Sequence, residues 1–379
     1  MKLVHLSDLH LGKKVNEFSM IEDQQYILRK ILEIIDAEQP DGVIIAGDVY
    51  DKTVPSAEAI ALLDDFLFSL SKRDLKVFVI SGNHDSAERL AFCTRLIERS
   101  GVHISQTYNG HVETVRLEDE YGLVDICLLP FVKPVNVRKF YPDEDIESYT
   151  DAIKIALSDV DTADGIRKVL VTHQFVTGAS RSESEDFSVG GSDNIDASVF
   201  EDFDYVALGH IHGPQNIGSE RIRYCGTPLK YSFSEAEQNK SVTVINLGID
   251  GNLDVRTREL EPLHDMVELK GSYEELTLKS FYEGTSYQTD YVHITLTDED
   301  DIPDAIFKLR VIYHNLMKLD YDNARTRHIS EITRSENVDK KTPLELCEEF
   351  FEKQNGSKPD KQQEDFLTEL IERIWEESK

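Results

Sequence analysis

The sequence predicts a layered protein of the mixed α/β class, followed by a small second α/β domain and a C-terminal helix-loop-helix. Through the first half of the 379 residues, short runs of aliphatic and β-branched residues alternate with amphipathic stretches of helical period. Five short polar segments that contain Asp, Asn or His each follow such a run. After residue 262 the alternation resumes on a smaller scale, and after residue 341 only helical patterns remain.

The first part of the chain alternates strands with helices, which is typical of a sheet covered by helices on both faces. The helical stretches carry apolar residues along one side, and Ser56 behind Pro55 is a suitable N-cap for the second of them. The expected strands are 2–6, 42–46 and 76–80, and the expected helices are 20–38, 56–71 and 86–99.

The rest of the first domain is rich in strands and closes with a hairpin. Between two of the polar segments, residues 181–191 form a polar loop that ends in glycine, and we expect it to be flexible and close to substrate. A turn at 249–252 joins the last two strands. The expected strands are 124–129, 169–172, 206–209, 222–225, 242–247 and 254–260.

Beyond Pro262 the chain forms a small domain, a linker and a tail. In the small domain we expect strands at 267–270 and 291–296, each followed by a helix, at 273–278 and 303–316. The predicted limits are 1–262 for the first domain, 266–324 for the small domain, 325–341 for the linker and 342–379 for the helix-loop-helix.

The tail begins with helix start signals, since Thr342 is a suitable N-cap, Pro343 fits the first helical position and Glu345 completes a capping box. Its two helices carry a broad apolar stripe that includes Phe350 and Trp375. That stripe must be buried, either against the same chain or against a partner, and the polar linker favours a partner.

The composition predicts a cytoplasmic protein without a membrane span. No stretch of about 18 consecutive apolar residues occurs, so no transmembrane helix is expected. The first residues lack a signal-peptide layout, because Asp8 and His10 lie where an apolar region would be needed. The four cysteines are scattered and form no C-x-x-C pair, so they fit reduced thiols better than disulfides or a zinc site.

The formal net charge of −31 argues against a protein that coats nucleic acid non-specifically, because phosphates repel an acidic surface. It does not exclude a nuclease. Metal ions can supply positive charge where a phosphate is cut, and a local basic strip can coexist with an acidic body. Most of the charge is explained by solvated acidic faces.

The five polar segments form a set of metal-ligand types. They are Asp8–His10, Gly47–Asp48, Gly82–Asp85, His173 and Gly209–His212, each at the carboxyl end of an expected strand, where function collects in such sheets. Each segment alone has an ordinary structural explanation as a cap, a turn or a strand edge. The ordered set of all five is much harder to explain in that way, and it predicts a functional site.

The chemistry expected of these residues is that of two metal ions on a phosphate. Asp8 and His10 are two residues apart and point to the same side, and Asp48 after Gly47 can bridge two ions. Asn83 offers an amide oxygen, and the other ligand candidates are the imidazoles of His173, His210 and His212. Oxygen and nitrogen ligands without thiolate suit manganese or iron(II), and zinc is possible. Two ions about 3.5–4 Å apart clamp a phosphate and activate water.

Two residues of the third segment are the predicted catalytic pair. His84 is not needed as a ligand, and Asp85 follows it directly. A histidine beside the metals, oriented by a carboxylate, is suited to stabilising the transition state and protonating the leaving oxygen.

The motifs D-x-H, G-D, G-N-H-D, H and G-H-x-H, in this order, resemble the calcineurin-like metallophosphoesterase superfamily. Stretches at 7–12, 178–185, 205–214 and 224–235 resemble, more narrowly, the SbcD family, the nuclease subunits of bacterial SbcCD complexes. The resemblance covers about residues 1–260 strongly, while the small domain and the tail match in layout more than in residues. It implies a layered metallophosphoesterase sandwich with a small capping domain and terminal helices.

The resemblance also implies an assignment of the ligands. One ion would be held by Asp8, His10, Asp48 and His212, and the other by Asp48, Asn83, His173 and His210. His84 would be the catalytic histidine. The implied activity is manganese-dependent exonuclease and endonuclease cleavage of DNA, including hairpins, in repair and recombination. Some relatives carry histidine at the position of Asp51, so no role is carried over to that side chain.

The partners implied by the resemblance are DNA, a second copy of the chain and an SbcC-like coiled-coil ABC-type ATPase. The terminal helices would bind the base of the coiled coil, and the helices expected at 56–71 and 86–99 would form the dimer contact. The first candidates for DNA contacts adjoin the motifs and are Lys13, Lys14, Arg89, Arg181 and Lys230.

Two other functions remain open from the residues alone. The same ligands would serve a phosphoesterase acting on nucleotides or phosphoproteins, although such an enzyme would not need the small domain or the tail. A scaffold that kept the fold and lost the chemistry is the third alternative, and the complete ligand set argues against it.

Overall fold

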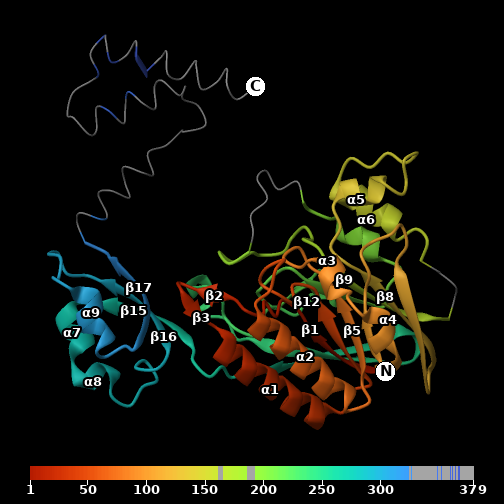
Figure 1. The fold of residues 1–379 in the computed structure, drawn as a ribbon, viewed down its shortest axis with the longest axis horizontal. Coiled ribbons are helices and arrows are strands. Elements are labelled where there is room, and N and C mark those ends of the chain that lie inside the picture. Colours follow the sequence, from red (N-terminus) through yellow and green to blue (C-terminus); the bar gives the residue numbers. More distant parts are fainter. Residues whose placement is uncertain are drawn as a thin grey trace. The chain divides into compact units, whose positions relative to one another are not determined.

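The computed structural model describes residues 1–160, 165–185 and 193–323, with scattered single positions between 326 and 367. Its first part contains two six-stranded sheets, which Figure 1 shows behind the helices α1 and α2. The strand orders are β14-β13-β1-β4-β5-β6 in the first sheet and β11-β12-β10-β9-β8-β7 in the second. The inner strands β1, β4 and β5 pair in parallel, as do β8, β9 and β10.

The first sheet forms from the strands expected near the N-terminus. Its outer face is covered by α1 (Ile21–Glu38) and α2 (Ala57–Ser71), whose buried Ile27, Ile31 and Leu63 pack into one apolar cluster with the sheet. Ser56 caps α2 by accepting a hydrogen bond from the amide of Ala59, as predicted. The strands are β1 (Lys2–Leu6), β4 (Gly42–Ala46), β5 (Lys76–Ile80), β6 (Val102–Ile104), β13 (Ser241–Leu247) and β14 (Leu253–Glu259).

The second sheet carries its own helices on the opposite side. Helix α6 (Tyr149–Ala156) contributes Ile153 and Ala156 to an apolar cluster that also contains Leu170 and Val206 of the sheet. The strands are β7 (Glu113–Asp119), β8 (Gly122–Leu129), β9 (Arg167–His173), β10 (Tyr205–Gly209), β11 (Gln215–Ile217) and β12 (Ser219–Tyr224), and the shorter helix is α5 (Pro134–Arg138).

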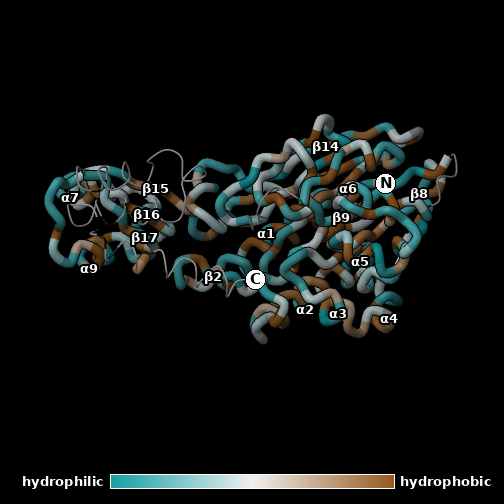
Figure 2. Tube along the Cα trace, turned by 90° about the horizontal axis from the view of Figure 1, so that it is seen from above, coloured by the Kyte–Doolittle hydropathy of each residue, from teal (hydrophilic) through white to brown (hydrophobic). Residues whose placement is uncertain are grey.

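A third apolar cluster fills the space between the two sheets. It joins Leu3, Ile44 and Phe78 of the first sheet to Val169 and Tyr205 of the second. The inner strands are therefore buried on both faces, which is why they are continuous apolar runs in the sequence (Figure 2). The order helix, sheet, sheet, helix confirms the predicted layered α/β fold.

The small domain contains a three-stranded sheet in the order β15-β16-β17. Its strands are β15 (Met266–Gly271), β16 (Tyr291–Leu296) and β17 (Asn315–Tyr321), and its helices are α7 (Tyr273–Thr277), α8 (Lys279–Tyr282) and α9 (Ala305–Arg310). The prediction of one helix over 303–316 was wrong, because α9 ends at Arg310, a turn follows, and Leu316 already belongs to β17. Short apolar runs fit strand and helix equally well, and here pairing with β16 decides between them.

Two other local predictions also differ from the structure. The single helix expected at 86–99 is broken into α3 (Ala87–Leu90), α4 (Thr94–Ile97) and a 3-10 turn (Glu98–Ser100), because Cys93 between α3 and α4 takes a left-handed backbone with φ 64°. Strand β7 was missed, since it is an edge strand whose exposed positions carry charged residues such as Glu118.

The chain separates into two compact units, one comprising 1–270, 274–295 and 304–320 and the other 271–273, 296–303 and 321–379. The predicted linker at 325–341 and the helix-loop-helix at 342–379 lie essentially outside the described residues, and the predicted domain limits remain predictions. In the described part of the chain, no helix has the length and apolar character needed to cross a bilayer.

Candidate metal centre

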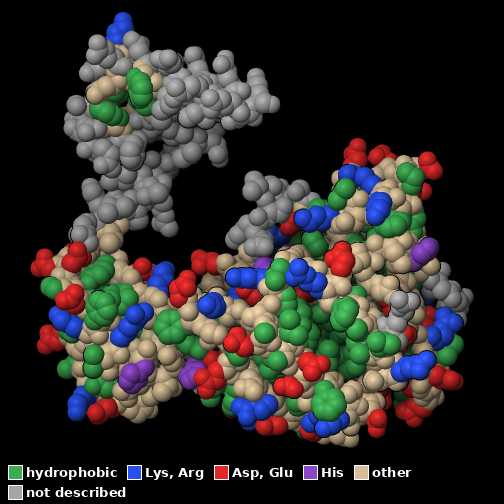
Figure 3. Space-filling view, in the orientation of Figure 1, with side chains coloured by type: hydrophobic (Ala, Val, Ile, Leu, Met, Phe, Trp, Pro, Cys, Tyr) green, Lys and Arg blue, Asp and Glu red, His purple; other side chains and the backbone are tan. Residues whose placement is uncertain are grey.

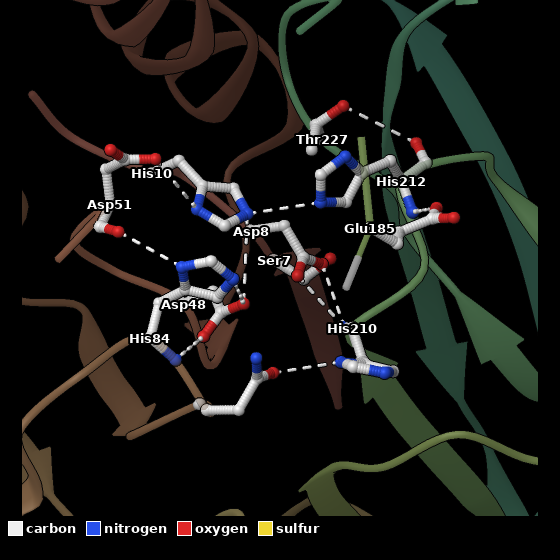
Figure 4. A network of polar contacts seen from close by, with 12 residues as sticks. Ser7, Asp8, His10, Asp48, Asp51, His84, Glu185, His210, His212 and Thr227 are labelled. Carbon is white, nitrogen blue, oxygen red and sulfur yellow. Dashed lines mark hydrogen bonds and ion pairs between the residues drawn. The ribbon is translucent and has the colours of Figure 1, made fainter. Parts of the chain in front are cut away.

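All five polar segments lie together at the carboxyl ends of β1, β4, β5, β9 and β10. Figure 4 shows labelled residues of four of them, namely Asp8 and His10, Asp48, His84, and His210 and His212. Within each sheet this follows from parallel pairing, which brings strand ends to one edge. The two sheets are joined at the site by His173, whose Nδ1 donates to the carbonyl oxygen of Ala46 over 2.9 Å. The structure therefore brings together every residue that the sequence predicts as a metal ligand.

The carboxylate of Asp48 lies at the centre of the cluster. Its Oδ2 is 3.3 Å from Nε2 of His173 and 3.8 Å from Nε2 of His10, so it is near imidazoles from both sheets. Its Oδ1 accepts a hydrogen bond of 2.9 Å from the amide of His84. This is the geometry expected of a carboxylate that bridges two ions.

Two groups of possible ligands lie on either side of Asp48. On one side, Nε2 of His10 and Nε2 of His212 are 3.1 Å apart, and both are close to a carboxylate oxygen of Asp8. On the other side, Oδ1 of Asn83 is 3.0 Å from Nε2 of His173 and 2.9 Å from Nδ1 of His210. These groups coincide with the two sets that the sequence resemblance implies.

Four of these residues hold a left-handed backbone that non-glycine residues rarely adopt. The φ angles are 52° at Asp8, 43° at His10, 45° at Asp48 and 100° at His210. Such conformations persist only where the surroundings enforce them, and they cluster at functional sites. Gly82 faces Asp48 so closely that an added Cβ would lie 2.1 Å from its Oδ1.

Hydrogen bonds fix which imidazole nitrogen faces the cluster. Nδ1 of His173 is bound to Ala46, and Nδ1 of His212 lies 2.6 Å from the hydroxyl of Ser184. Nδ1 of His84 is 3.0 Å from the carbonyl oxygen of Asp51. In each case Nε2 points toward Asp48 or His10. For His173 and His212 this is the arrangement of ligand histidines whose second nitrogen is held by a partner.

The electrostatics favour a bound cation. Burial raises the pKa of the Asp8 carboxyl to about 6. Burial alone would also raise the pKa of Asp48, but His173, His10 and His84 together hold it well below its usual range. Burial lowers the pKa of His210 to about 3 and that of His10 well below its ordinary value, which favours the neutral imidazole, the form that binds metal ions.

His173 differs from the other imidazoles. Burial acts to lower its pKa, but the carboxylates of Asp48 and Asp8 outweigh burial and raise the pKa to about 9. The same carboxylates that raise the pKa of His173 would also attract a divalent ion to this place. Buried carboxylates, neutral imidazoles and an amide oxygen that converge in this way fit two divalent cations with mixed oxygen and nitrogen ligands.

The carboxylate of Asp85 has contacts other than the expected ones. The sequence suggested that it orients His84, but Oδ1 accepts from the amide of Tyr50 over 2.9 Å, and Oδ2 accepts from the amides of Val49 and Gly82 over 3.1 and 2.9 Å. Asp85 thus holds the loops after β4 and β5 together, and the main-chain oxygen of Asp51 is a partner of the His84 ring. The reason is that three backbone amides of these loops occupy both carboxylate oxygens of Asp85.

Several polar residues behind His212 were not predicted. Glu235 is fully buried, accepts a short hydrogen bond from Ser184 and forms an ion pair of 2.6 Å with Lys240. Glu185 accepts from the amide of His212 over 2.6 Å. The sequence signal was weak, since Ser184 and Glu185 lie in the polar loop 181–191 and nothing in the spacing relates Glu235 to His212.

The candidate DNA contacts are mostly engaged with acidic groups. Lys13 pairs with Asp51 at 2.8 Å, Lys230 with Asp265 at 2.8 Å, and Arg181 with Asp193 at 3.2 Å while stacking on Phe175. Arg89 is exposed and donates to the carbonyl of Thr53, and Lys14 is exposed. On the visible face in Figure 3, basic and acidic side chains are interspersed. DNA contact by these five residues remains a prediction.

Comparison with family models agrees with this site. A model described as "Calcineurin-like phosphoesterase" matches residues 1–214, which include every candidate ligand. A second model, described as "Type 5 capsule protein repressor C-terminal domain", matches residues 262–355.

Curated relatives match along nearly the whole chain. A protein of Staphylococcus epidermidis, named as the SbcD subunit of the nuclease SbcCD, is 32% identical over 378 residues, which cover 99% of each chain. A protein of the same name from Staphylococcus saprophyticus is 34% identical over 323 residues, or 84% of each chain.

Solved structures show weaker likeness. TT1561 of Thermus thermophilus matches with a TM-score of 0.39 and 13% identity, over 68% of this chain and 98% of that one. A dimetal phosphatase from Danio rerio matches with a TM-score of 0.42 and 12% identity, over 69% of this chain and 98% of that one.

Proposed function

The chain belongs to the SbcD family of calcineurin-like phosphoesterases and is a metal-dependent nuclease, and from this premise we propose that it hydrolyses DNA phosphodiester bonds with two ions held between its sheets. Under this proposal Asp8, His10 and His212 hold one ion and Asn83, His173 and His210 hold the other. Asp48 is shared. The observation that carries the proposal is the position of Asp48 between imidazoles of both sheets.

The ions would supply the positive charge that attracts a phosphate and would acidify a water molecule beside it. The protein supplies orientation. His84, held at Nδ1 by the carbonyl of Asp51, presents Nε2 at 4.0 Å from Oδ2 of Asp48. From there it can protonate the leaving oxygen, a step that contributes typically about 10²–10⁴-fold to the rate. We assign Asp85 a positioning role, because its contacts hold the loop that carries His84.

The test of the proposal compares DNA with a small substrate. The purified chain, alone and with its ATPase, is incubated with Mn²⁺ and a hairpin-ended duplex, and in parallel with a chromogenic phosphodiester. We expect metal-dependent cleavage of both, and loss of both in Asp48→Asn. Brisk turnover of the small substrate without DNA cleavage in any state would favour the alternative of an enzyme for nucleotides or phosphoproteins.

His84→Gln separates catalysis from metal binding. Because His84 is proposed to donate a proton and not to hold an ion, we expect cleavage to fall by about 10²–10⁴-fold. Titration calorimetry with Mn²⁺ should give the affinity of the unchanged protein. Full activity in this variant, or loss of bound metal, would contradict the role.

Manganese is the proposed physiological metal. The candidate ligands are oxygen and nitrogen atoms without thiolate, which suits Mn²⁺ and Fe²⁺ and permits Zn²⁺. Reconstitution of metal-free protein with each ion should give the highest nuclease activity with Mn²⁺, and higher activity with another ion would overturn the choice.

The proposed setting is a cytoplasmic complex that processes DNA ends in repair and recombination. The curated relatives are named as subunits of SbcCD, and we propose that this chain binds an SbcC-like coiled-coil ATPase through residues 342–379. We also propose a homodimer, which is supported by the exposed Phe68 of α2 and by Phe92 and Leu96 near α3 and α4. The small domain would contact DNA.

A further inference from the structure

Two pairs of adjacent residues connect the small domain to the loop that carries the first candidate ligands. The first pair is Asp23–Gln24 at the start of α1, and the second is Lys230–Tyr231, which follows β12. Within each pair, one side chain contacts residues at the start of the small domain's strands. Its neighbour contacts the loop after β1.

The small-domain contacts are made by Asp23 and Lys230. Asp23 is fully buried, and its Oδ1 accepts from the backbone N–H of His264 over 3.2 Å and lies 3.1 Å from the ring Nδ1. Its Oδ2 accepts from the hydroxyl of Tyr291 over 2.7 Å. Lys230 forms an ion pair of 2.8 Å with Asp265. Since β15 begins after Asp265 and β16 begins at Tyr291, both strands are fixed where they start.

The neighbouring residues hold the loop after β1. Nε2 of Gln24 donates to the carbonyl of His10 over 2.8 Å, and its Oε1 accepts from the amide of Gly12 over 2.9 Å. The hydroxyl of Tyr231 donates to the carbonyl of Leu9 over 2.6 Å, and the Tyr231 ring lies edge-on to the His10 ring at 5.7 Å. Both side chains are almost completely buried.

A direct hydrogen bond unites the two pairs, since Nε2 of Gln24 donates to the hydroxyl of Tyr231 over 3.0 Å. The held loop is also the one in which Asp8 and His10 have a left-handed backbone. A non-glycine backbone keeps that conformation only where surrounding contacts enforce it. Because adjacent α-carbons are only about 3.8 Å apart, a displacement of Asp23 is transmitted to Gln24.

We propose that Asp23, Gln24, Lys230 and Tyr231 are positioning residues that couple the placement of the small domain to the geometry of the loop carrying Asp8 and His10. The inference rests on the proposed function, because it gives that loop its metal-binding role. A substrate or partner that moves the start of β15 and β16 would change the first metal site without touching it. The coupling follows from paired contacts and does not require a flexible hinge.

The test uses two matched tyrosine substitutions. Tyr291→Phe removes only the hydroxyl bound to Asp23, while Tyr313→Phe removes an equivalent hydroxyl in the same small domain, where Tyr313 donates to the carbonyl of Leu276 over 2.7 Å. Both residues are buried. The first measurement is hydrogen exchange of the 8–13 segment in metal-free protein, where Leu11 and Lys13 donate backbone hydrogen bonds.

We expect exchange at Leu11 and Lys13 to be at least severalfold faster in Tyr291→Phe and unchanged in Tyr313→Phe. Lys230→Met changes the other pair, and it should also make hydrogen exchange at Leu11 and Lys13 faster. Equal exchange in the wild type, Tyr291→Phe and Lys230→Met would overturn the inference, whatever their thermal stabilities.

A second measurement separates this inference from the proposed function. With Mn²⁺ and a chromogenic phosphodiester, Tyr291→Phe should show a lower Mn²⁺ affinity and a lower kcat with little change in KM, since the binding of the small substrate itself is not altered. Absence of metal-dependent hydrolysis in the wild type would refute the proposed function, while the exchange result would still decide the coupling.

Discussion

At the scale of single residues, the candidate metal centre depends on close approaches that leave no room for a methyl group. Asp48 can be reached from both sheets because Gly82 permits contact with its carboxylate and Gly47 permits contact with His173. The sequence predicted which candidate ligands lie close together, since each follows an apolar strand. It could not predict Ser184 and Glu235, whose contact with His212 depends on folding of residues far apart in the chain.

Gly82→Ala should disrupt the proposed bridging ligand. A Cβ added at position 82 would lie 2.1 Å from Oδ1 of Asp48, so the carboxylate must move. We expect Mn²⁺ affinity to fall by roughly 10–100-fold, as for other changes that misplace a ligand, measured by titration calorimetry. Gly248→Ala is the control, because the nearest atom to its added Cβ is 3.4 Å away. Normal affinity in Gly82→Ala would show that Asp48 does not need its present position.

Ser184→Ala should weaken metal binding through His212. The hydroxyl links Nδ1 of His212 to the buried Glu235, and without it the ring loses the partner that directs Nε2 toward His10. We expect a loss of Mn²⁺ affinity of about 10-fold, with recovery in Ser184→Thr, which restores a hydroxyl. An alanine variant that binds as tightly as the wild type would assign Ser184 to loop structure alone.

At the scale of elements, burial on both faces made the inner strands predictable, and exposure made the others hard to find. Strands β1, β4 and β5 are continuous apolar runs, whereas β7 has charged residues at its exposed positions. The break between α3 and α4 depends on the φ of Cys93, which periodicity does not show. The end of α9 and the start of β17 depend on strand pairing rather than on local preference.

The ion pair between Asp119 of β7 and Arg167 of β9 should make folding stability depend on pH. Hydrogen bonds from Arg167 hold the pKa of Asp119 well below its usual range. Because the pKa is lower in the folded state, ionised Asp119 stabilises the fold fully at pH values above the ordinary carboxyl pKa of 3.8. This stabilisation is lost as the pH falls from 3.8 toward the folded-state pKa. Asp119→Asn should therefore lower the free energy of unfolding by about 1–2 kcal/mol at pH 7.

Urea unfolding of Asp119→Asn and the wild type from pH 7 to pH 3 tests this expectation, and the difference should narrow as pH drops below 4. Asp254→Asn is the matched control, because its pair with Arg256 is largely exposed and such pairs contribute little. A difference that stays constant with pH would contradict the assigned ionic contribution.

At the scale of the whole molecule, an acidic nuclease is expected to attract phosphate mainly through the metal ions that it would bind. The net charge is −31, and Lys13, Arg181 and Lys230 are paired with carboxylates. Cleavage should therefore depend more strongly on metal than on a general basic surface. The predicted tail could not be compared with the structure, since its residues lie essentially outside the described ranges.

Deleting residues 342–379 should separate partner binding from chemistry. Because the candidate ligands all lie within residues 8–212, the truncated chain is expected to hydrolyse the chromogenic phosphodiester at the rate of the full chain. Binding to the coiled-coil ATPase, measured by size-exclusion chromatography with light scattering, should be lost. Retained binding would place the partner surface elsewhere on the chain.

The left-handed backbone at Asp8, His10, Asp48 and His210 also limits which amino acids can be inherited there. Asp, Asn and His are the non-glycine residues that enter this region most readily, while β-branched and bulky residues are strongly disfavoured. Substitutions at these four positions are therefore expected mainly among Asp, Asn, His and Gly, because a β-branched residue would strain the main chain there. The main chain thus restricts the ligand types at these positions to carboxylate, amide and imidazole groups.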